Sequence, residues 1–209
     1  MKRPRGVYGL PAGFVAGLPA GLMAGLPARF VAGFTKVELL VVISILALST
    51  SFAMPAFSRW LPNYRLKGAV RDLYSNLQLA KSAAIRDRGE CAVEFDREAN
   101  RYQVVSGGID RIYSTGDDNV VLKTVVLPDY GSGCSFGPGT ATRKVGQNEP
   151  IRDSVSFPGD RVVFNFRGMT TGTFGGYAYL QNDRNDCYAV GTWSTGIVVL
   201  RKWNGSAWE

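Results

Sequence analysis

The sequence predicts an α+β protein, in which a long N-terminal hydrophobic helix packs on an antiparallel, β-rich head. Three observations support this. Residues 39–58 carry no charge and, as a helix, would be about 30 Å long, which is the thickness of a bilayer core. Residues 63–88 repeat apolar side chains every three or four positions, as an amphipathic helix does. The remainder alternates apolar and polar residues between turn segments, as strands do.

Residues 1–33 are predicted to be a leader that is removed. Residues 9–32 are three copies of an eight-residue unit beginning Gly-Leu-Pro-Ala, and a proline every eight residues is incompatible with a regular helix. Without the four basic residues that precede Gly33, the chain has 20 basic and 17 acidic residues, a net charge of +3 instead of +7. The basic leader fits the cytoplasmic side of a membrane. Translation from Met23 instead of Met1 would give a shorter leader.

Residues 34–58 are predicted to span a membrane as a helix. An ordinary secretory signal has its charges before the apolar core and a small-residue cleavage site after it. In this chain a glycine, Gly33, and a carboxylate, Glu38, both precede the apolar core. This order distinguishes the segment from a secretory signal.

The run from Gly33 to Leu40, GFTKVELL, resembles the cleavage and methylation motif of type IV prepilins and type II secretion pseudopilins. The resemblance implies that a membrane peptidase cuts after Gly33 and methylates the new amino terminus at Phe34. It also implies a pilin-like fold, with residues 34–58 in the core of a filament. Lys36 departs from the pattern, because that position is usually apolar in the family.

Glu38 is predicted to take part in assembly. A carboxylate inside a membrane helix costs about 2.5 to 3.5 kcal/mol, so it requires a partner or a place at the interface. In the pilin-like interpretation, Glu38 pairs with the free amine of a neighbouring subunit's Phe34 and sets the packing register. The alternative is that Glu38 lies at the headgroup level beside Lys36.

Residues 59–89 are predicted to continue the helix as an amphipathic segment. Pro55, near the end of the apolar segment, removes a backbone N–H and softens the helix, which filament packing can exploit. Gly89 is predicted to end the helix. Residues 77–86, LQLAKSAAIR, look like the helix end in the GspH/FimT group of minor pseudopilins. One stripe of apolar residues is predicted to lie on the head: Leu66, Val70, Leu73, Leu77, Ala80 and Ala84.

Residues 90–209 are predicted to form a periplasmic head. Residues 129–153 are rich in glycine and proline and are predicted to be a long surface loop. Residues 162–168, VVFNFRG, again resemble the GspH/FimT head. Antiparallel strands are predicted at residues 91–95, 101–106, 120–127, 155–157, 161–166, 176–180, 187–192 and 196–203.

The cysteines and the absence of histidine limit the chemistry. In an exported head, Cys134 and Cys187, which fall in or beside polar loops, are favoured over Cys91 as a disulfide pair; three reduced thiols are the alternative. With no histidine, the commonest general base and metal ligand are missing. We therefore expect no catalytic residues and no cofactor. Residues 116–119 and 182–186 lack EF-hand spacing and are predicted to be polar turns, not metal sites.

The C-terminal strand places Arg201, Lys202 and Trp203 near the end of the chain. FimT-like minor pilins of natural transformation bind DNA with basic residues in this region, by phosphate neutralisation and aromatic stacking. The alternative is that Arg201 and Lys202 protect the edge of the last strand while Trp203 packs on the core. The modest net charge of the chain after Gly33 favours the alternative.

Together these features predict a minor pilin-like subunit of a type II secretion pseudopilus, with a role in assembly. Its expected partners are other pilin or pseudopilin subunits, the prepilin peptidase and the bacterial inner membrane, which it crosses once with its head in the periplasm. Two alternatives stay open: a type IV pilus minor pilin involved in pilus assembly or DNA uptake, and a membrane-tethered periplasmic binding module.

Overall fold

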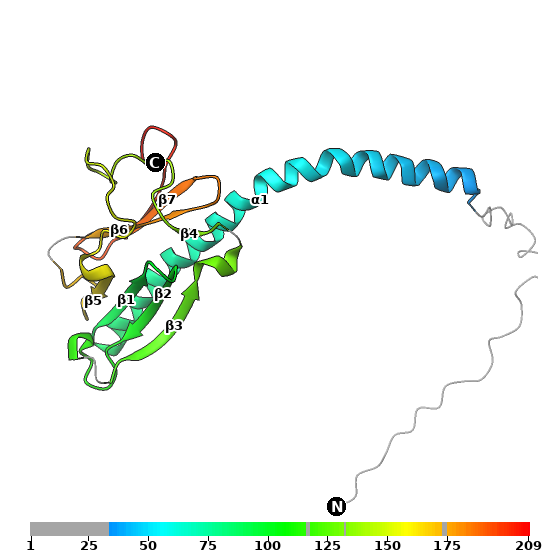
Figure 1. Cartoon of the computed structure of the whole chain (residues 1–209). Coiled ribbons are helices and arrows are strands. Elements are labelled where there is room, and N and C mark those ends of the chain that lie inside the picture. Colours follow the sequence, from blue (N-terminus) through cyan, green and yellow to red (C-terminus); the bar gives the residue numbers. More distant parts are fainter. Residues whose placement is uncertain (1–33, 116–117, 132, 173–174) are drawn as a thin grey trace, which may run out of the picture. The chain divides into compact units, whose positions relative to one another are not determined.

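The computed structural model describes residues 34–115, 118–131, 133–172 and 175–209, apart from the side chains of Ala53, Pro55 and Ala56 (Figure 1). The predicted leader, with Gly33 and Met23, lies outside the described residues. The chain divides into two compact units, with the boundary between Ser49 and Thr50. The predicted α+β class is confirmed, because a long helix is followed by two antiparallel sheets.

Helix α1 runs from Lys36 to Asp87. Among the described residues, no single helix is both long enough and apolar enough to cross a membrane. The segments Lys36–Phe52 and Phe57–Asp87 reach that length and hydropathy only when they are taken together as one bent pair. At the end of α1, the N–H of Gly89 donates to the carbonyl of Ala84 at 3.1 Å.

Helix α1 ends at Asp87, two residues before Gly89, as the sequence predicted. The left-handed residue after the helix is Arg88, with φ of 50°, and not the glycine. Gly89 is small for another reason, because a Cβ there would lie 2.7 Å from the Cβ of Arg111.

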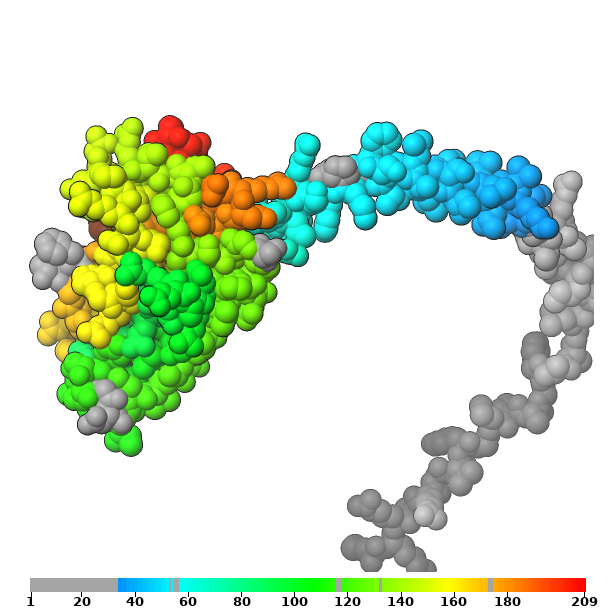
Figure 2. All heavy atoms as spheres, viewed as in Figure 1, coloured from blue at the N-terminus to red at the C-terminus, as the bar shows by residue number. Residues whose placement is uncertain are grey.

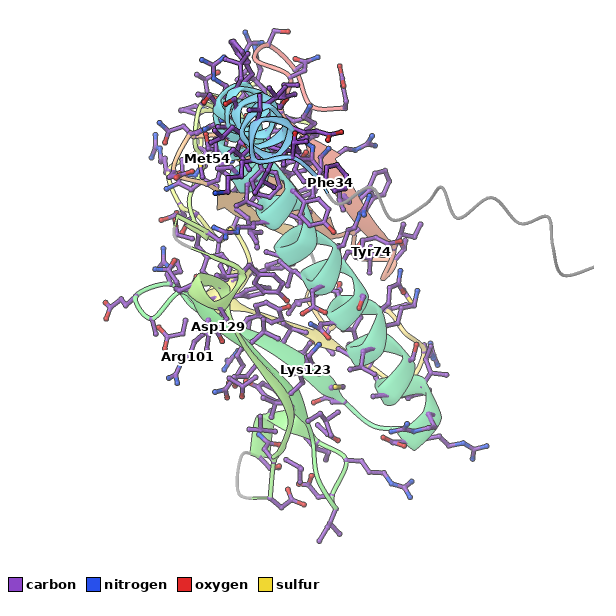
Figure 3. The ribbon with its side chains drawn as sticks, turned by 90° about the vertical axis from the view of Figure 1, so that its right-hand side faces the viewer. Phe34, Met54, Tyr74, Arg101, Lys123 and Asp129 are labelled. Atoms are coloured by element: carbon purple, nitrogen blue, oxygen red, sulfur yellow. The ribbon has the colours of Figure 1, made fainter. Side chains whose placement is uncertain are left out.

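The head contains two antiparallel sheets. The first has the order β3-β2-β1-β5 and the second the order β4-β6-β7-β8. In both views of the head, the later turns of α1 run along the strands of the first sheet (Figures 1 and 3). The strands are β1 Cys91–Asp96, β2 Arg101–Ser106, β3 Val120–Val126, β4 Ser135–Phe136, β5 Arg161–Phe164, β6 Gly176–Gln181, β7 Cys187–Thr192 and β8 Val198–Lys202.

The main core lies between α1 and both sheets. All six residues of the predicted helix stripe are buried, which confirms the stripe. They pack with Val93 and Val104 of the first sheet and with Leu180 and Val190 of the second. The helix therefore covers one face of each sheet, and burial of this stripe fixes its second half on the head.

Two of the strand predictions are wrong, because one strand was not predicted and one predicted strand does not form. Residues 135–136, in the predicted loop, form β4 and pair with Gln181 and Leu180 of β6. Conversely, residues 155–157 do not form a strand, and only Val155 makes an isolated bridge, with Ala178. Segments of two and three residues are too short to show the alternation of apolar and polar side chains by which a strand is recognised in a sequence.

Candidate assembly and interaction sites

The first turn of α1 is capped by a side chain. The backbone N–H of Glu38 donates to Oγ1 of Thr35 at 3.2 Å, and the N–H of Leu39 donates to the carbonyl of Thr35 at 3.0 Å. Threonine followed three residues later by glutamate is the sequence pattern of a capping box. An acidic side chain in the first turn is also favoured by the helix dipole. The helix therefore begins in a defined way at Lys36, two residues after Phe34, with the exposed Glu38 in its first turn.

Large apolar side chains on the first part of α1 are exposed. This is more contiguous apolar surface than soluble monomers tolerate, and such surface marks contact with a membrane or another protein. The hydroxyls in the segment are satisfied within the helix, because Ser44 donates to the carbonyl of Leu40 at 2.7 Å and Ser49 donates to that of Ile45 at 2.8 Å. The exposed residues are Phe34, Val37, Leu39, Leu40, Val41, Val42, Ile43, Ile45, Leu46 and Leu48.

Two residues of the predicted processing and assembly site are not fully described. Gly33, the predicted cleavage position, lies outside the described residues. Pro55 lies within the helical range of α1, but its side chain is outside the described part. Phe34 and Glu38 are both described, and both are exposed.

The C-terminal residues divide into two exposed or half-buried cations and a buried aromatic. Arg201 is half-buried and Lys202 is exposed on the edge strand β8, whereas Trp203 is only 6% exposed. Trp203 packs in a cluster with Tyr179. The partly buried Trp208 packs against this cluster. The burial of Trp203 agrees with the alternative that it packs on the core, and it leaves the ring unable to stack on a nucleic-acid base.

The C-terminal tail partly covers the edge of β8. The backbone groups of Lys202 and Glu209 exchange two hydrogen bonds of 2.9 Å, and the indole of Trp208 donates to the carbonyl of Arg143 at 2.7 Å. Figure 2 shows the tail, in red, beside the yellow-green residues that precede Ile151. This tail protects the end of an edge strand that would otherwise be open to pairing.

The expected disulfide between Cys134 and Cys187 is absent, because all three cysteines are buried free thiols. The topology explains the correction. Ser135, next to Cys134, and Cys187 pair with Gln181 from opposite edges of β6. Strands separated by a third are roughly 9 to 10 Å apart, whereas the Cα atoms of a disulfide are at most about 7 Å apart. The two thiols also lie in different clusters, on opposite faces of the second sheet.

A cavity of about 610 Å³ lies on the outer face of the first sheet. Four of its lining residues contact one another: the hydroxyl of Tyr113 donates to Glu94, the backbone N–H of Tyr113 donates to Glu90 at 3.0 Å, and the guanidinium of Arg161 lies 5.7 Å from the centre of the Tyr113 ring. These contacts hold the segment after β2 against the sheet. They form no nucleophile and base pair.

Residues 182–186 form the predicted polar turn. Oδ1 of Asn182 accepts the backbone N–H groups of Arg184 and Asp186, each at 2.9 Å. The other Asx-rich segment, 116–119, begins with two residues outside the described part of the chain.

A polar cluster that the sequence did not predict lies between α1 and β3. Nζ of Lys123 lies 3.2 Å from Oδ1 of Asp72 and donates to Oδ1 of Asn76 at 3.1 Å, and the hydroxyl of Tyr130 donates to Asp72. The helical spacing of Asp72 and Asn76 placed both on one face. Their partners, Lys123 on β3 and Tyr130 after it, are brought near only by the tertiary structure.

Comparison with protein families matches residues 69–201 to the family described as type II transport protein GspH. Among solved structures, the minor pseudopilin EpsH of the type 2 secretion system of Vibrio cholerae is similar, with 13% identity, a TM-score of 0.45, and coverage of 66% of this chain and 97% of that one. The type IV minor pilin FimU of Pseudomonas aeruginosa has 10% identity, a TM-score of 0.44, and coverage of 72% and 96%. Comparison with curated proteins found no match.

Proposed function

This chain belongs to the GspH family of type II transport proteins, and we propose that it is a minor pseudopilin that is cleaved after Gly33, methylated at Phe34 and assembled through its N-terminal helix. In this role the protein is an assembly component of the cell envelope, not a catalyst. Its partners are other pseudopilin subunits.

One observation carries the proposal. Helix α1 joins an apolar exposed stretch, which begins at Phe34, to a stripe that is buried in the head. A globular protein acting alone gains nothing from the exposed stretch, since that surface is unfavourable in water. In a membrane the stretch is solvated by lipid, and in a filament it packs on the same stretch of other subunits. The same residues thus serve before and after assembly.

The proposal extends to location. The prepilin peptidase removes residues 1–33 on the cytoplasmic side, the helix crosses the inner membrane once, and the head lies in the periplasm. The concentration of positive charge before Gly33 supports this orientation.

The mature N-terminus tests the proposal. Mass spectrometry of the protein from its own host is expected to find a chain that starts at N-methylated Phe34. Protein from a peptidase-deficient strain is the control and is expected to keep the leader, whose mass also shows whether Met1 or Met23 starts it. An intact leader in the wild-type strain, or a cut beyond Phe57, contradicts the proposal.

The secretion role has its own test. Deletion of the gene is expected to reduce the export of secreted proteins and to leave twitching motility and DNA uptake unchanged. The reverse result supports the type IV pilus alternative instead.

A further inference from the structure

A basic pocket lies on the first turns of α1 that follow the uncharged stretch. Its volume is about 410 Å³. Five of its lining residues come from α1 and one, Tyr130, comes from the short helix Leu127–Tyr130 after β3. The lining consists of Tyr64, Arg65, Lys67, Gly68, Arg71 and Tyr130, so it holds three cations and no carboxylate.

The three cations are available to a ligand. Among the described residues, no ion pair involves Arg65, Lys67 or Arg71. The nearby carboxylate of Asp72 is already paired with Lys123 and accepts a hydrogen bond from Tyr130. No carboxylate lines the pocket, so an anion in it would meet three cations.

The glycine in the floor of the pocket has no packing reason to be a glycine. Gly68 is in the interior of a helix, where glycine costs about 1 kcal/mol relative to alanine. A Cβ at this position would lie 3.7 Å from Cδ1 of Tyr130, which is ordinary van der Waals contact. The space above Gly68 is thus kept open at a cost in stability, as expected of a binding site.

Aromatic side chains connect the apolar segment to the pocket. The ring of Trp60 lies 6.5 Å from that of Phe57 and is stacked on that of Tyr64 at 4.7 Å. Both Trp60 and Tyr64 are exposed. Tryptophan and tyrosine in this position, directly after an apolar stretch, are typical of the headgroup layer of a membrane.

Two of the three cations, Arg65 and Lys67, are near the same layer. Arg65 and Lys67 follow Ser58, the last residue of the uncharged stretch, by about 10 and 14 Å along a helix. The headgroup layer is roughly 5 to 8 Å thick on each side. Side chains on a helix tilt towards its N-terminus, so the exposed side chain of Lys67 can extend back towards the bilayer, whereas that of Arg65 lies against Gly131.

We propose that this pocket binds the phosphate headgroup of an anionic phospholipid. The proposal rests on the proposed function, because only a membrane-anchored chain brings the pocket to a bilayer. Arginine binds phosphate in a bidentate manner, lysine adds a point charge, and the free hydroxyl of Tyr64 is a further donor. The pocket lies next to the aromatic residues Trp60 and Tyr64, which favours a lipid over an acidic protein surface. The bound lipid would hold the head at the membrane before assembly.

Native mass spectrometry of the full chain in detergent tests this proposal. The wild-type protein is expected to bind phosphatidylglycerol at least tenfold more tightly than phosphatidylcholine. The double variant K67Q/R71Q is expected to lose about thirtyfold in affinity for phosphatidylglycerol, since each cation near a membrane surface contributes roughly a factor of five. The matched control, R201Q/K202Q, removes two cations from β8 and is expected to bind as the wild type does.

A second variant separates binding from folding. Gly68→Leu keeps every charge and improves helix propensity, but it fills the pocket. It is expected to lose the preference for phosphatidylglycerol while it unfolds at the same or a higher temperature. Retention of the preference by this variant and by K67Q/R71Q contradicts the proposal.

Other outcomes identify a different ligand. If inorganic phosphate at millimolar concentration binds the wild-type pocket but phosphatidylglycerol has no advantage over phosphatidylcholine, the site binds free phosphate and the lipid proposal is wrong. If the variants keep the lipid preference but fail to assemble with other subunits, the pocket binds an acidic protein surface. The same spectra report the mature mass, so a failed lipid site with methylated Phe34 is distinguishable from an unprocessed chain.

Discussion

Nδ2 of Asn76 on α1 donates to the hydroxyl of Tyr102 on β2 at 2.7 Å, and these residues are only 2% and 1% exposed. The carbonyl oxygen of the same amide accepts from Lys123. Asn76 thus connects the helix to two strands of the first sheet, and a buried polar group in such a network is favourable only while its partners are present.

Asn76→Ala is expected to lower the free energy of unfolding by about 2 to 4 kcal/mol. It leaves the hydroxyl of Tyr102 buried without a partner, at about 1 to 3 kcal/mol, and removes packing as well. Urea denaturation followed by circular dichroism measures the change.

Tyr102→Phe is the control for this prediction. The double variant N76A/Y102F is expected to be about 1 kcal/mol more stable than the sum of the single effects implies, because no unpaired hydroxyl remains. Strictly additive effects would show that the hydrogen bond contributes nothing.

Gly196→Ala is expected to destabilise the head by about 3 kcal/mol or more. Gly196 has φ of 75°, and a Cβ there would lie 1.8 Å from the carbonyl oxygen of Gly168. The left-handed conformation alone costs about 1 to 2 kcal/mol for alanine, and the overlap with backbone adds to it. A thermal melt measures the effect as a drop in Tm.

Gly146 provides the matched control for Gly196. Its φ is 71°, but nothing lies within 4 Å of the position of a Cβ. Gly146→Ala is therefore expected to cost only the conformational part, about 1 to 2 kcal/mol. Equal drops in Tm for the two variants would mean that the close approach to Gly168 is not as tight as the structure has it.

The periodic parts of this fold were predictable from the sequence, and the reasons are local. The stripe from Leu66 to Ala84 follows the helical repeat, and in β2 the buried Tyr102 and Val104 alternate with the more exposed Arg101 and Gln103. Strand β4 was not predictable, because two residues carry no period and its pairing with β6 is a tertiary contact.

The interaction sites were less predictable than the fold. The motif from Gly33 to Glu38 is a contiguous run, and it could be recognised without a structure. The burial of Trp203 depends on a tail that folds back, and the basic pocket depends on Tyr130, which lies 59 residues after Arg71 in the sequence. Contacts of this kind are set by topology, which no local pattern encodes.

The buried thiols make the stability of the head depend on alkaline pH. Burial raises the pKa of Cys91 and that of Cys187 to about 12 each, from an ordinary value of 9.0. A group with a raised pKa in the folded state contributes its full stability below pH 9. That stability is lost as the pH rises from 9 to 12, because the unfolded chain releases the proton first. Each thiol is expected to add at most about 1.4 kcal/mol per pH unit to the decline.

Cys187→Ala isolates this contribution. Its cavity lowers stability equally at all pH values, but the decline of the unfolding free energy between pH 9 and pH 10 is expected to be shallower than in the wild type. Urea denaturation in the presence of a reductant, at pH 7, 9 and 10, measures both slopes. Parallel curves for variant and wild type would show that the thiol of Cys187 does not titrate differently on folding.

Glu38→Ala is expected to reduce incorporation into the filament by at least about tenfold while processing after Gly33 continues. The carboxylate is exposed in the first turn of α1, which is fixed by the cap from Thr35, so it is held in place to meet the amine of a neighbouring Phe34. Loss of one partner of a desolvated charge pair costs about 2 kcal/mol or more, chiefly because the other charge is left unpaired. Glu38→Gln is expected to fail as well, since an amide cannot neutralise an ammonium group. Ser44→Ala is the matched control, because that exposed hydroxyl already donates to Leu40 within its own helix. The ratio of processed subunit in sheared filaments to that in membranes measures incorporation, and a wild-type ratio for Glu38→Ala would rule out the pairing with Phe34.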